Sequence, residues 1–212
     1  DVQTRTRFNE ANDSHYYLVP GVIVTIMTMI GALLTSLVMA REYERGTLES
    51  LFVTPVGSGE ILTAKAATNF LLGMVSLAIS MIFAAFVFDI PIRGSLTLLL
   101  AVSALFLIVA LGLGLVISTA TKNQFLACQF AIMGTFMPAL MLSGFLYDIL
   151  NMPPAVRALT YMIPARYYVT LLQTLFLAGD IPSVIIPCCI TLGVFAVVLM
   201  GIARLKAPKS LE

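Results

Sequence analysis

The side chains best suited to specific chemistry lie between Arg41 and Lys65. This stretch holds seven of the 23 charged residues: Arg41, Glu42, Glu44, Arg45, Glu49, Glu60 and Lys65. Opposite charges in its first half stand three or four positions apart, the spacing at which side chains pair along one helix. Leu48, Leu51 and Phe52 give that helix an apolar face. The chemistry expected here is recognition of another protein. The alternative is an interfacial helix that rests on lipid headgroups.

Glycine and proline divide this charged stretch. Pro55 disfavours helix at Thr54, and residues 57–59, Gly-Ser-Gly, form a flexible turn. The serine of that turn is placed to cap a second helix that continues through Lys65 into the next apolar segment. Gly46 lowers helix propensity by about 1 kcal/mol relative to alanine and permits a bend in the first helix. The sequence therefore predicts a short amphipathic helix, a sharp turn and a return to the membrane.

No other cluster in the sequence points to catalysis or to a bound metal. The single histidine, His15, lies in a polar run, and the three cysteines lie in apolar segments at spacings that fit neither a disulfide framework nor a metal site. The sequence contains no Gly-x-x-x-x-Gly-Lys-Ser/Thr phosphate loop, so we do not expect this chain to be an enzyme that hydrolyses ATP alone. A net charge of +1 without a basic run gives no reason to expect nucleic acid as a partner.

The segments that flank the charged stretch are those of a membrane protein. The chain is 59% hydrophobic and 11% charged, whereas soluble domains have about 45–50% apolar and about 25% charged residues. A helix needs roughly 20 apolar residues to cross a bilayer core about 30 Å thick, and open strands would leave backbone groups unpaired in lipid. Pro138 lies inside one such segment and is expected to kink it. The sequence predicts an all-α, polytopic membrane protein with five transmembrane helices at about 18–40, 66–88, 96–119, 125–147 and 184–203.

Basic residues indicate how these helices sit in the membrane. All four lysines fall in the connection 41–65, in the short turn 120–124, or after the last helix. Lysine and arginine are enriched in cytoplasmic loops, so we expect this side to face the cytoplasm. The residues 1–17 then end an outer, periplasmic region, the connection 148–183 faces outward, and residues 206–212 form a cytoplasmic tail.

The outward connection contains two short helical runs separated by proline. The second run, 166–178, is apolar but reaches only about 20 Å at about 1.5 Å per residue, which is too short to span. Gly179 is a plausible cap at its end. We expect a helical hairpin that re-enters the outer leaflet; the alternative is an amphipathic helix on the outer surface. The residues that define this outer re-entrant segment are Pro153, Pro154, Pro164, Arg166, Tyr167 and Tyr168.

Small residues recur every four positions along three of the predicted spans. Helices in membranes associate through close packing of small side chains, so these stripes predict helix contacts, either within the chain or at a subunit interface. They are Thr28, Ala32, Ser36 and Ala40 in the first span, Ala110, Gly114 and Ser118 in the third, and Ala127, Ala131, Thr135, Ala139 and Ser143 in the fourth.

Two stretches resemble ABC-2 type export permeases, in particular the bacterial drug-efflux branch. The run REYERGTLESLFVTPVGSGEILTAKA is similar to the family pattern of Lys/Arg-Glu-x-Glu-x-Gly-Thr followed by Thr/Ser-Pro. The run LTYMIPARYYVTLLQTLFLAG looks like the family's outer segment before its last helix. The resemblance covers nearly the whole chain, with residues 18–205 as the transmembrane domain. Because family members have six spans, it implies a C-terminal portion that lacks the first span and most of the periplasmic domain.

The resemblance implies a permease subunit of an ATP-binding cassette exporter in a bacterial inner membrane. Such a subunit moves an amphiphilic or hydrophobic substrate outward, a drug-like molecule or a lipid. A separate ATPase subunit binds ATP and Mg, so this chain needs no cofactor of its own. A second permease subunit, in a homodimer or heterodimer, and membrane lipid are the other implied partners. By position, the coupling helix that contacts the ATPase subunit comprises Arg41, Glu42, Glu44, Arg45, Gly46, Thr47, Leu48 and Glu49, with a turn at Thr54 and Pro55.

Other functions stay open at this point. One is a permease for lipid-linked glycans, and another is a membrane subunit that assembles a complex without transporting anything. A secondary transporter is disfavoured, because no Asp, Glu, Lys, Arg or His lies in the middle of a predicted span, where proton and ion pathways place such groups.

Overall fold

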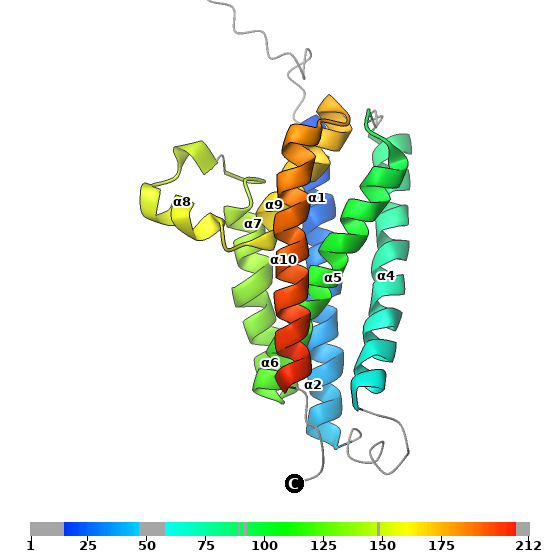
Figure 1. Cartoon of the computed structure of the whole chain (residues 1–212), viewed down its shortest axis with the longest axis vertical. Coiled ribbons are helices and arrows are strands. Elements are labelled where there is room, and N and C mark those ends of the chain that lie inside the picture. The colour runs from blue at the N-terminus through cyan, green and yellow to red at the C-terminus, as the bar shows by residue number, and fades with distance from the viewer. Residues whose placement is uncertain (1–14, 47–57, 89, 91–92, 148, 207–212) are drawn as a thin grey trace, which may run out of the picture.

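The structure is a computed structural model that describes residues 15–46, 58–88, 90, 93–147 and 149–206. Within these residues the fold is all-helical, which confirms the predicted class, and no strand occurs. The long helices stand side by side as an antiparallel bundle (Figure 1). In the described part of the chain, five helical segments are long and apolar enough to cross a membrane: Leu18–Arg45, Thr63–Phe86, Leu96–Thr121, Gln124–Leu142 and Pro182–Lys206.

The first span is one continuous helix built from α1 (His15–Thr28), the π-helical turn η1 (Met29–Leu34) and α2 (Thr35–Arg45). It runs past the predicted end at residue 40, because nothing interrupts its backbone hydrogen bonding before Gly46. That glycine adopts a left-handed φ of 66°, which ends the helix at little steric cost. Residues 41–45 therefore extend the transmembrane helix instead of forming a separate one, and Gly46 ends a helix instead of bending it.

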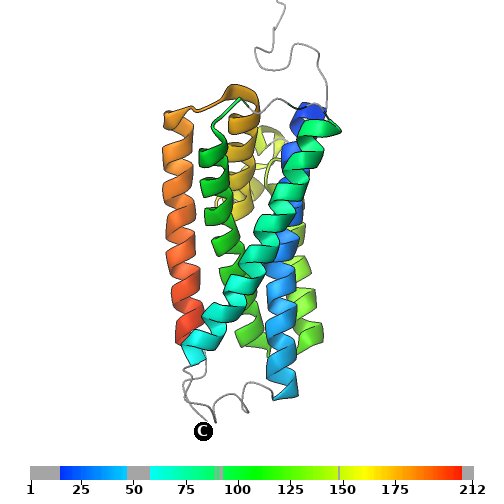
Figure 2. The same cartoon turned by 90° about the vertical axis from the view of Figure 1, so that its right-hand side faces the viewer.

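Three further spans consist of the long helices α4 (Ser58–Phe86), α5 (Leu96–Thr121) and α10 (Pro182–Lys206). The sequence predicted Ser58 as the residue that caps this helix, and in the structure α4 already begins at Ser58. Figure 2 shows α4 running obliquely across the bundle, from α1 at one end towards the C-terminal end of α10 at the other.

The fourth span is interrupted near its centre. It comprises α6 (Gln124–Ala131), the π-helical turn η2 (Ile132–Phe136) and α7 (Met137–Leu142). Pro138 lies in the first turn of α7, just after the π turn. A proline removes one backbone donor and clashes with the carbonyl four residues before it, and a wider turn relieves that clash. The disturbance predicted from Pro138 thus takes the form of a π turn, and the helix stops before residue 147.

The turn between the third and fourth spans is as short as predicted. Lys122 has a φ of 48° and closes α5, and the side chain of Asn123 accepts a hydrogen bond from the backbone N–H of Leu126 at 3.1 Å. Asn123 therefore caps α6. The predicted tight turn is confirmed, and it is shorter than 120–124, because α5 runs to Thr121 and α6 begins at Gln124.

The outward connection forms the 3₁₀ turn η3 (Ile149–Asn151), α8 (Pro154–Thr160), α9 (Pro164–Gln173) and the π turn η4 (Thr174–Ala178). Figure 1 shows α8 projecting from the bundle, while α9 lies among α1, α7 and α10. Gly179 ends η4 with a φ of 90°. Entry of this pair into a lipid leaflet stays a prediction, but a helix resting on a surface does not describe α9, because its apolar side chains form the centre of the core.

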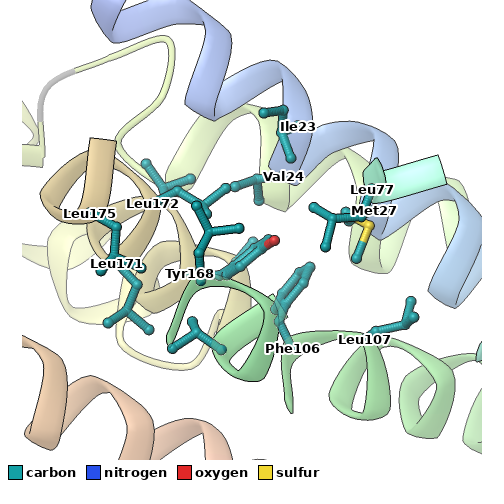
Figure 3. Packing of buried hydrophobic residues seen from close by; sticks show 14 of the residues in the cluster. Ile23, Val24, Met27, Leu77, Phe106, Leu107, Tyr168, Leu171, Leu172 and Leu175 are labelled. Atoms are coloured by element: carbon teal, nitrogen blue, oxygen red, sulfur yellow. The ribbon is translucent and has the colours of Figure 1, made fainter. Parts of the chain in front are cut away.

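That core joins α1, α4, α5 and α9 (Figure 3). Tyr168 of α9 and Phe106 of α5 are both fully buried and stack with ring centroids 4.1 Å apart. Leu171, Leu172 and Leu175 of the same α9–η4 run surround them. A short helix of this kind is held by burial of its apolar side chains, each contributing about 1.5–3 kcal/mol.

The small-residue stripes pack helices together inside the chain, which confirms the contacts that they predicted. All twelve of their residues are buried. At Gly31, a β-carbon would lie 2.4 Å from the Cβ of Ala110, and at Gly114, one would lie 2.7 Å from the carbonyl oxygen of Ala32. The first span and α5 therefore approach each other closely enough to exclude any side chain at these glycines.

Candidate functional site

The charged end of the bundle is the candidate functional site. It is formed where α2, α5 and α10 end and where α4 and α6 begin (Figure 1). The structure brings together at this end most of the basic residues that the sequence assigned to one side of the membrane: Arg41, Arg45, Lys65, Lys122, Arg204 and Lys206. Which end faces the cytoplasm stays a prediction from the distribution of lysine.

An ion pair links the first two spans at this end. The Nζ of Lys65 on α4 contacts Oε1 of Glu42 on α2. The two side chains are only 30% and 18% exposed, so the pair is partly shielded from solvent. In the sequence, Glu42 stands three positions before Arg45, a spacing that allows pairing along one helix, and the structure shows an ion pair from Glu42 to the neighbouring helix.

A second carboxylate of α2 reaches the start of the fourth span. The Oε2 of Glu44 accepts a hydrogen bond from the backbone N–H of Gln124 at 2.9 Å. Gln124 is the first residue of α6, where unpaired N–H groups and the helix dipole favour a negative charge. Glu42 and Glu44 thus connect the end of α2 to two other spans.

Tyr43, between these two glutamates, anchors the end of α2 in an apolar cluster. It packs with Met39 against Leu115 of α5 and Ala203 of α10. Glu42 and Glu44 therefore join the end of the first span to α4 and α6, and Tyr43 packs against a cluster shared with α5 and α10.

Two arginines of the predicted coupling helix face outward. Arg41 and Arg45 are exposed, in contrast to the half-buried Glu42 and Tyr43. A surface that contacts a partner subunit needs such accessible groups. The remaining residues predicted for this helix and its turn, namely Thr47, Leu48, Glu49, Thr54 and Pro55, lie outside the described residues.

The predicted outer residues are brought together where α8 meets α9. Arg166 donates a hydrogen bond to the hydroxyl of Thr160, and its guanidinium lies 3.9 Å from the centre of the Tyr161 ring. The hydroxyl of Tyr167 donates to the carbonyl of Tyr161 at 3.0 Å. Arg166 and Tyr167 therefore fasten the end of α8 to the start of α9. The prolines act as expected at helix starts: Pro153 precedes α8, Pro154 begins it, and Pro164 begins α9.

Tyr168 has a different role, because it points into the core (Figure 3). The Tyr168 hydroxyl donates a hydrogen bond to Oγ of Ser103 on α5 at 2.8 Å. The Ser103 hydroxyl in turn donates to the backbone carbonyl of Leu99 at 2.7 Å. A buried hydroxyl needs such a partner. Tyr168 therefore anchors α9 to α5.

Replacing Tyr168 with phenylalanine should remove this hydrogen bond and keep the stacking on Phe106. We expect a loss of about 1 kcal/mol in the free energy of unfolding, the usual contribution of one buried hydrogen bond. The measurement is the unfolding midpoint of the detergent-solubilised full-length protein. Tyr167→Phe is the matched control, because its hydroxyl lies at the α8–α9 junction and its loss should have a smaller effect. An equal loss in both variants would contradict the anchoring role of Tyr168.

One polar contact in the spans was missed by the sequence reasoning. Nδ2 of Asn69 on α4 donates to Oγ1 of Thr35 on α2 at 3.0 Å, and both side chains are buried. Asn69 was visible in the sequence as an amide near the start of a span, and amides in membranes bond across helices. Its partner depends on the register between two helices, which the sequence does not supply. Among the described residues, no group of three His, Cys, Asp or Glu side chains is placed to hold a metal ion.

Comparison with known proteins identifies relatives of this chain. A profile of the ABC-2 type transporter family matches residues 2–177. The probable multidrug ABC transporter permease YbhS of Escherichia coli K12 is 48% identical over 212 residues, which is all of this chain and 56% of that protein. The probable multidrug ABC transporter permease YbhR of the same organism is 31% identical over 84% of this chain and 48% of that protein. The E. coli K12 inner membrane transport permease YhhJ is 28% identical over 99% of this chain and 56% of that protein. The chain thus spans about half the length of these relatives.

Proposed function

The chain belongs to the ABC-2 type transporter family, and from this membership we propose that it forms the membrane part of an export permease driven by a separate ATPase subunit. It is a multi-pass membrane protein with five candidate spans in its described residues. The relatives YbhS and YbhR carry the name of multidrug transporter permeases, which supports a drug-like, amphiphilic substrate for this chain as well. We place the permease in a bacterial inner membrane, where it pairs with a second permease subunit.

The observation that carries this proposal is the set of contacts at the end of α2. The ATPase subunit, which binds ATP and Mg, docks on the segment that begins at Arg41 and continues past Gly46. Its ATP-driven closure displaces the end of α2. The pairs Glu42–Lys65 and Glu44–Gln124 then carry this displacement into α4 and α6. A plain connecting loop would not need carboxylates that bind two neighbouring spans.

Charge reversal at the exposed arginines tests the docking surface. We expect the double variant Arg41→Glu/Arg45→Glu to lower drug-stimulated ATPase activity at least tenfold, because two accessible cations are replaced by anions while Lys65 and Gln124, the partners of Glu42 and Glu44, stay in place. The measurement uses the full-length permease with its ATPase subunit in proteoliposomes. Arg157→Glu on α8 is the matched control, since it reverses an exposed charge away from this end and should leave stimulation unchanged.

The outcomes separate the competing functions. Unchanged stimulation in the double variant would exclude Arg41 and Arg45 from the docking surface. An unaltered complex that binds its ATPase subunit but shows no stimulation by drugs or lipids would favour a non-transporting assembly subunit. Stimulation by lipid-linked glycans alone would identify the other alternative.

A further inference from the structure

A long apolar groove lies between α4, α5 and α10 near the charged end of the bundle. Its volume is about 450 Å³, within the range of about 300–1,000 Å³ in which proteins bind small ligands. Each helix contributes one face, with residues spaced three or four apart. The lining residues are Thr63, Ala66, Ala67 and Phe70 of α4, Ile108, Leu111, Leu115 and Thr119 of α5, and Met200, Ala203 and Arg204 of α10.

The polar residues of the groove all lie at one end. Thr63 is near the start of α4, Thr119 is near the end of α5, and Arg204 is in the last turn of α10. The opposite end is lined by Phe70 and Ile108, which lie deeper along their helices. The groove therefore has the polarity of an amphiphile with a single polar head and an apolar tail.

The length of the groove distinguishes between possible occupants. Ile108 and Thr119 are eleven residues apart, which is about 16 Å along a helix that rises about 1.5 Å per residue. A bilayer core is about 30 Å thick, so the groove extends through about one leaflet. A further membrane-spanning helix would need about twice this length, whereas a lipid acyl chain occupies one leaflet.

The polar end of the groove carries positive charge that can bind an anionic headgroup. Arg204 is exposed at the mouth of the groove, and Lys206 follows it on the same helix end. Basic pockets between transmembrane helices bind anionic headgroups, and guanidinium groups bind phosphate with two parallel hydrogen bonds. We propose that this groove binds an anionic phospholipid, with one acyl chain along α5 and its phosphate at Arg204. This site lies beyond the docking surface proposed above and does not depend on it.

Small side chains keep the groove open. Ala66 and Ala67 on α4 and Ala203 on α10 leave the space that larger residues would fill. A phenylalanine at Ala67 would occupy the path of the acyl chain. Replacing Arg204 with glutamine removes the charge at the mouth and leaves the apolar lining intact. These two variants test the tail site and the head site separately.

The experiment uses the full-length protein in nanodiscs that contain phosphatidylcholine and a photoreactive phosphatidylglycerol with a diazirine in its acyl chain. After irradiation, peptide mass spectrometry maps the labelled residues. We expect labelling concentrated at 63–70, 108–119 and 200–204. We also expect that labelling to fall about tenfold in Ala67→Phe and in Arg204→Gln. Lys122→Gln is the matched control, because it removes an exposed charge at the same end outside the groove and should retain full labelling.

Three results would overturn the proposal. Labelling spread evenly over the exposed faces of α4 and α10 would indicate ordinary annular lipid. If a photoreactive amino acid introduced at Phe70 crosslinks to another protein segment and not to lipid, protein fills the groove. Displacement of the probe by a transported drug would assign the groove to cargo. If Ala67→Phe fails to fold, the test rests on Arg204→Gln alone. In that variant, labelling by the anionic probe must fall, whereas labelling by an otherwise identical phosphatidylcholine probe must stay unchanged.

Discussion

Replacing Gly114 with alanine is expected to destabilise the bundle, although the same change inside a helix ordinarily stabilises it by about 1 kcal/mol. Gly114 lies on α5 where the first span crosses it. An added β-carbon would lie 2.7 Å from the carbonyl oxygen of Ala32 and 2.9 Å from the Cβ of Thr35. The first of these atoms belongs to the backbone and cannot rotate away. The two helices must therefore separate, and that loses the packing on which membrane helices depend.

We expect a loss of about 3 kcal/mol for Gly114→Ala, at the upper end of the usual range for overpacking, and a larger loss for Gly114→Leu. Gly193 on α10 provides the matched control, because no atom lies within 4 Å of the position of its β-carbon. The measurement is the unfolding midpoint of the detergent-solubilised full-length protein, for Gly114→Ala and Gly193→Ala in parallel. We expect the unfolding midpoint to fall in Gly114→Ala and to stay unchanged or rise in Gly193→Ala. Equal midpoints would mean that the close approach of α5 to the first span does not limit stability.

These glycine contacts show which parts of the fold can be predicted from sequence. Ala32 and Gly114 belong to stripes of small residues with a spacing of four, and a stripe on one helix face must meet another surface wherever helices pack closely. The number of spans follows from apolar length in the same direct way. Such features depend on periodicity within one helix, so no knowledge of the neighbouring helix is needed.

Features that depend on how two helices are placed relative to each other could not be predicted in this way. The pairs Glu42–Lys65 and Asn69–Thr35 both require the register between α2 and α4. From spacing alone, Glu42 has an equally good partner in Arg45. The charges at 41–45 also suggested the end of a span, but charge does not stop a helix, and the backbone continues until Gly46 permits a left-handed residue.

The α9 helix could be predicted only in part from the sequence. Its length and apolar character predicted a helix too short to span the membrane, and the structure confirms a short helix. The structure also shows that this helix is buried in the core, which the sequence did not predict. The position of α9 against α5 came only from the structure, because Tyr168 bonds to Ser103, 65 residues away in sequence. A tyrosine in an apolar run signals a need for a hydrogen-bond partner without indicating which one.

Exchanging the charges of Glu42 and Lys65 should distinguish an internal link from a direct contact with the ATPase subunit. Each single reversal, Glu42→Lys or Lys65→Glu, places two like charges together and should lower drug-stimulated ATPase activity about tenfold. The two side chains are 18% and 30% exposed, so we expect a loss of about 1–2 kcal/mol in stability instead of the 3–5 kcal/mol of a fully buried pair. Copurification of the ATPase subunit should be unchanged, because Arg41 and Arg45 remain in place.

The double variant Glu42→Lys/Lys65→Glu restores opposite charges at the two positions in reversed order. If the pair transmits displacement from α2 to α4, stimulation should return to at least half of the value of the unaltered protein. If instead Glu42 contacts the ATPase subunit directly, as its position in the coupling motif implied, the double variant should stay as inactive as Glu42→Lys alone. The unaltered protein, the two single variants and the double variant form a double-mutant cycle, which gives the interaction energy between positions 42 and 65. This energy distinguishes an ion pair that links two helices inside the permease from a residue that contacts the ATPase subunit.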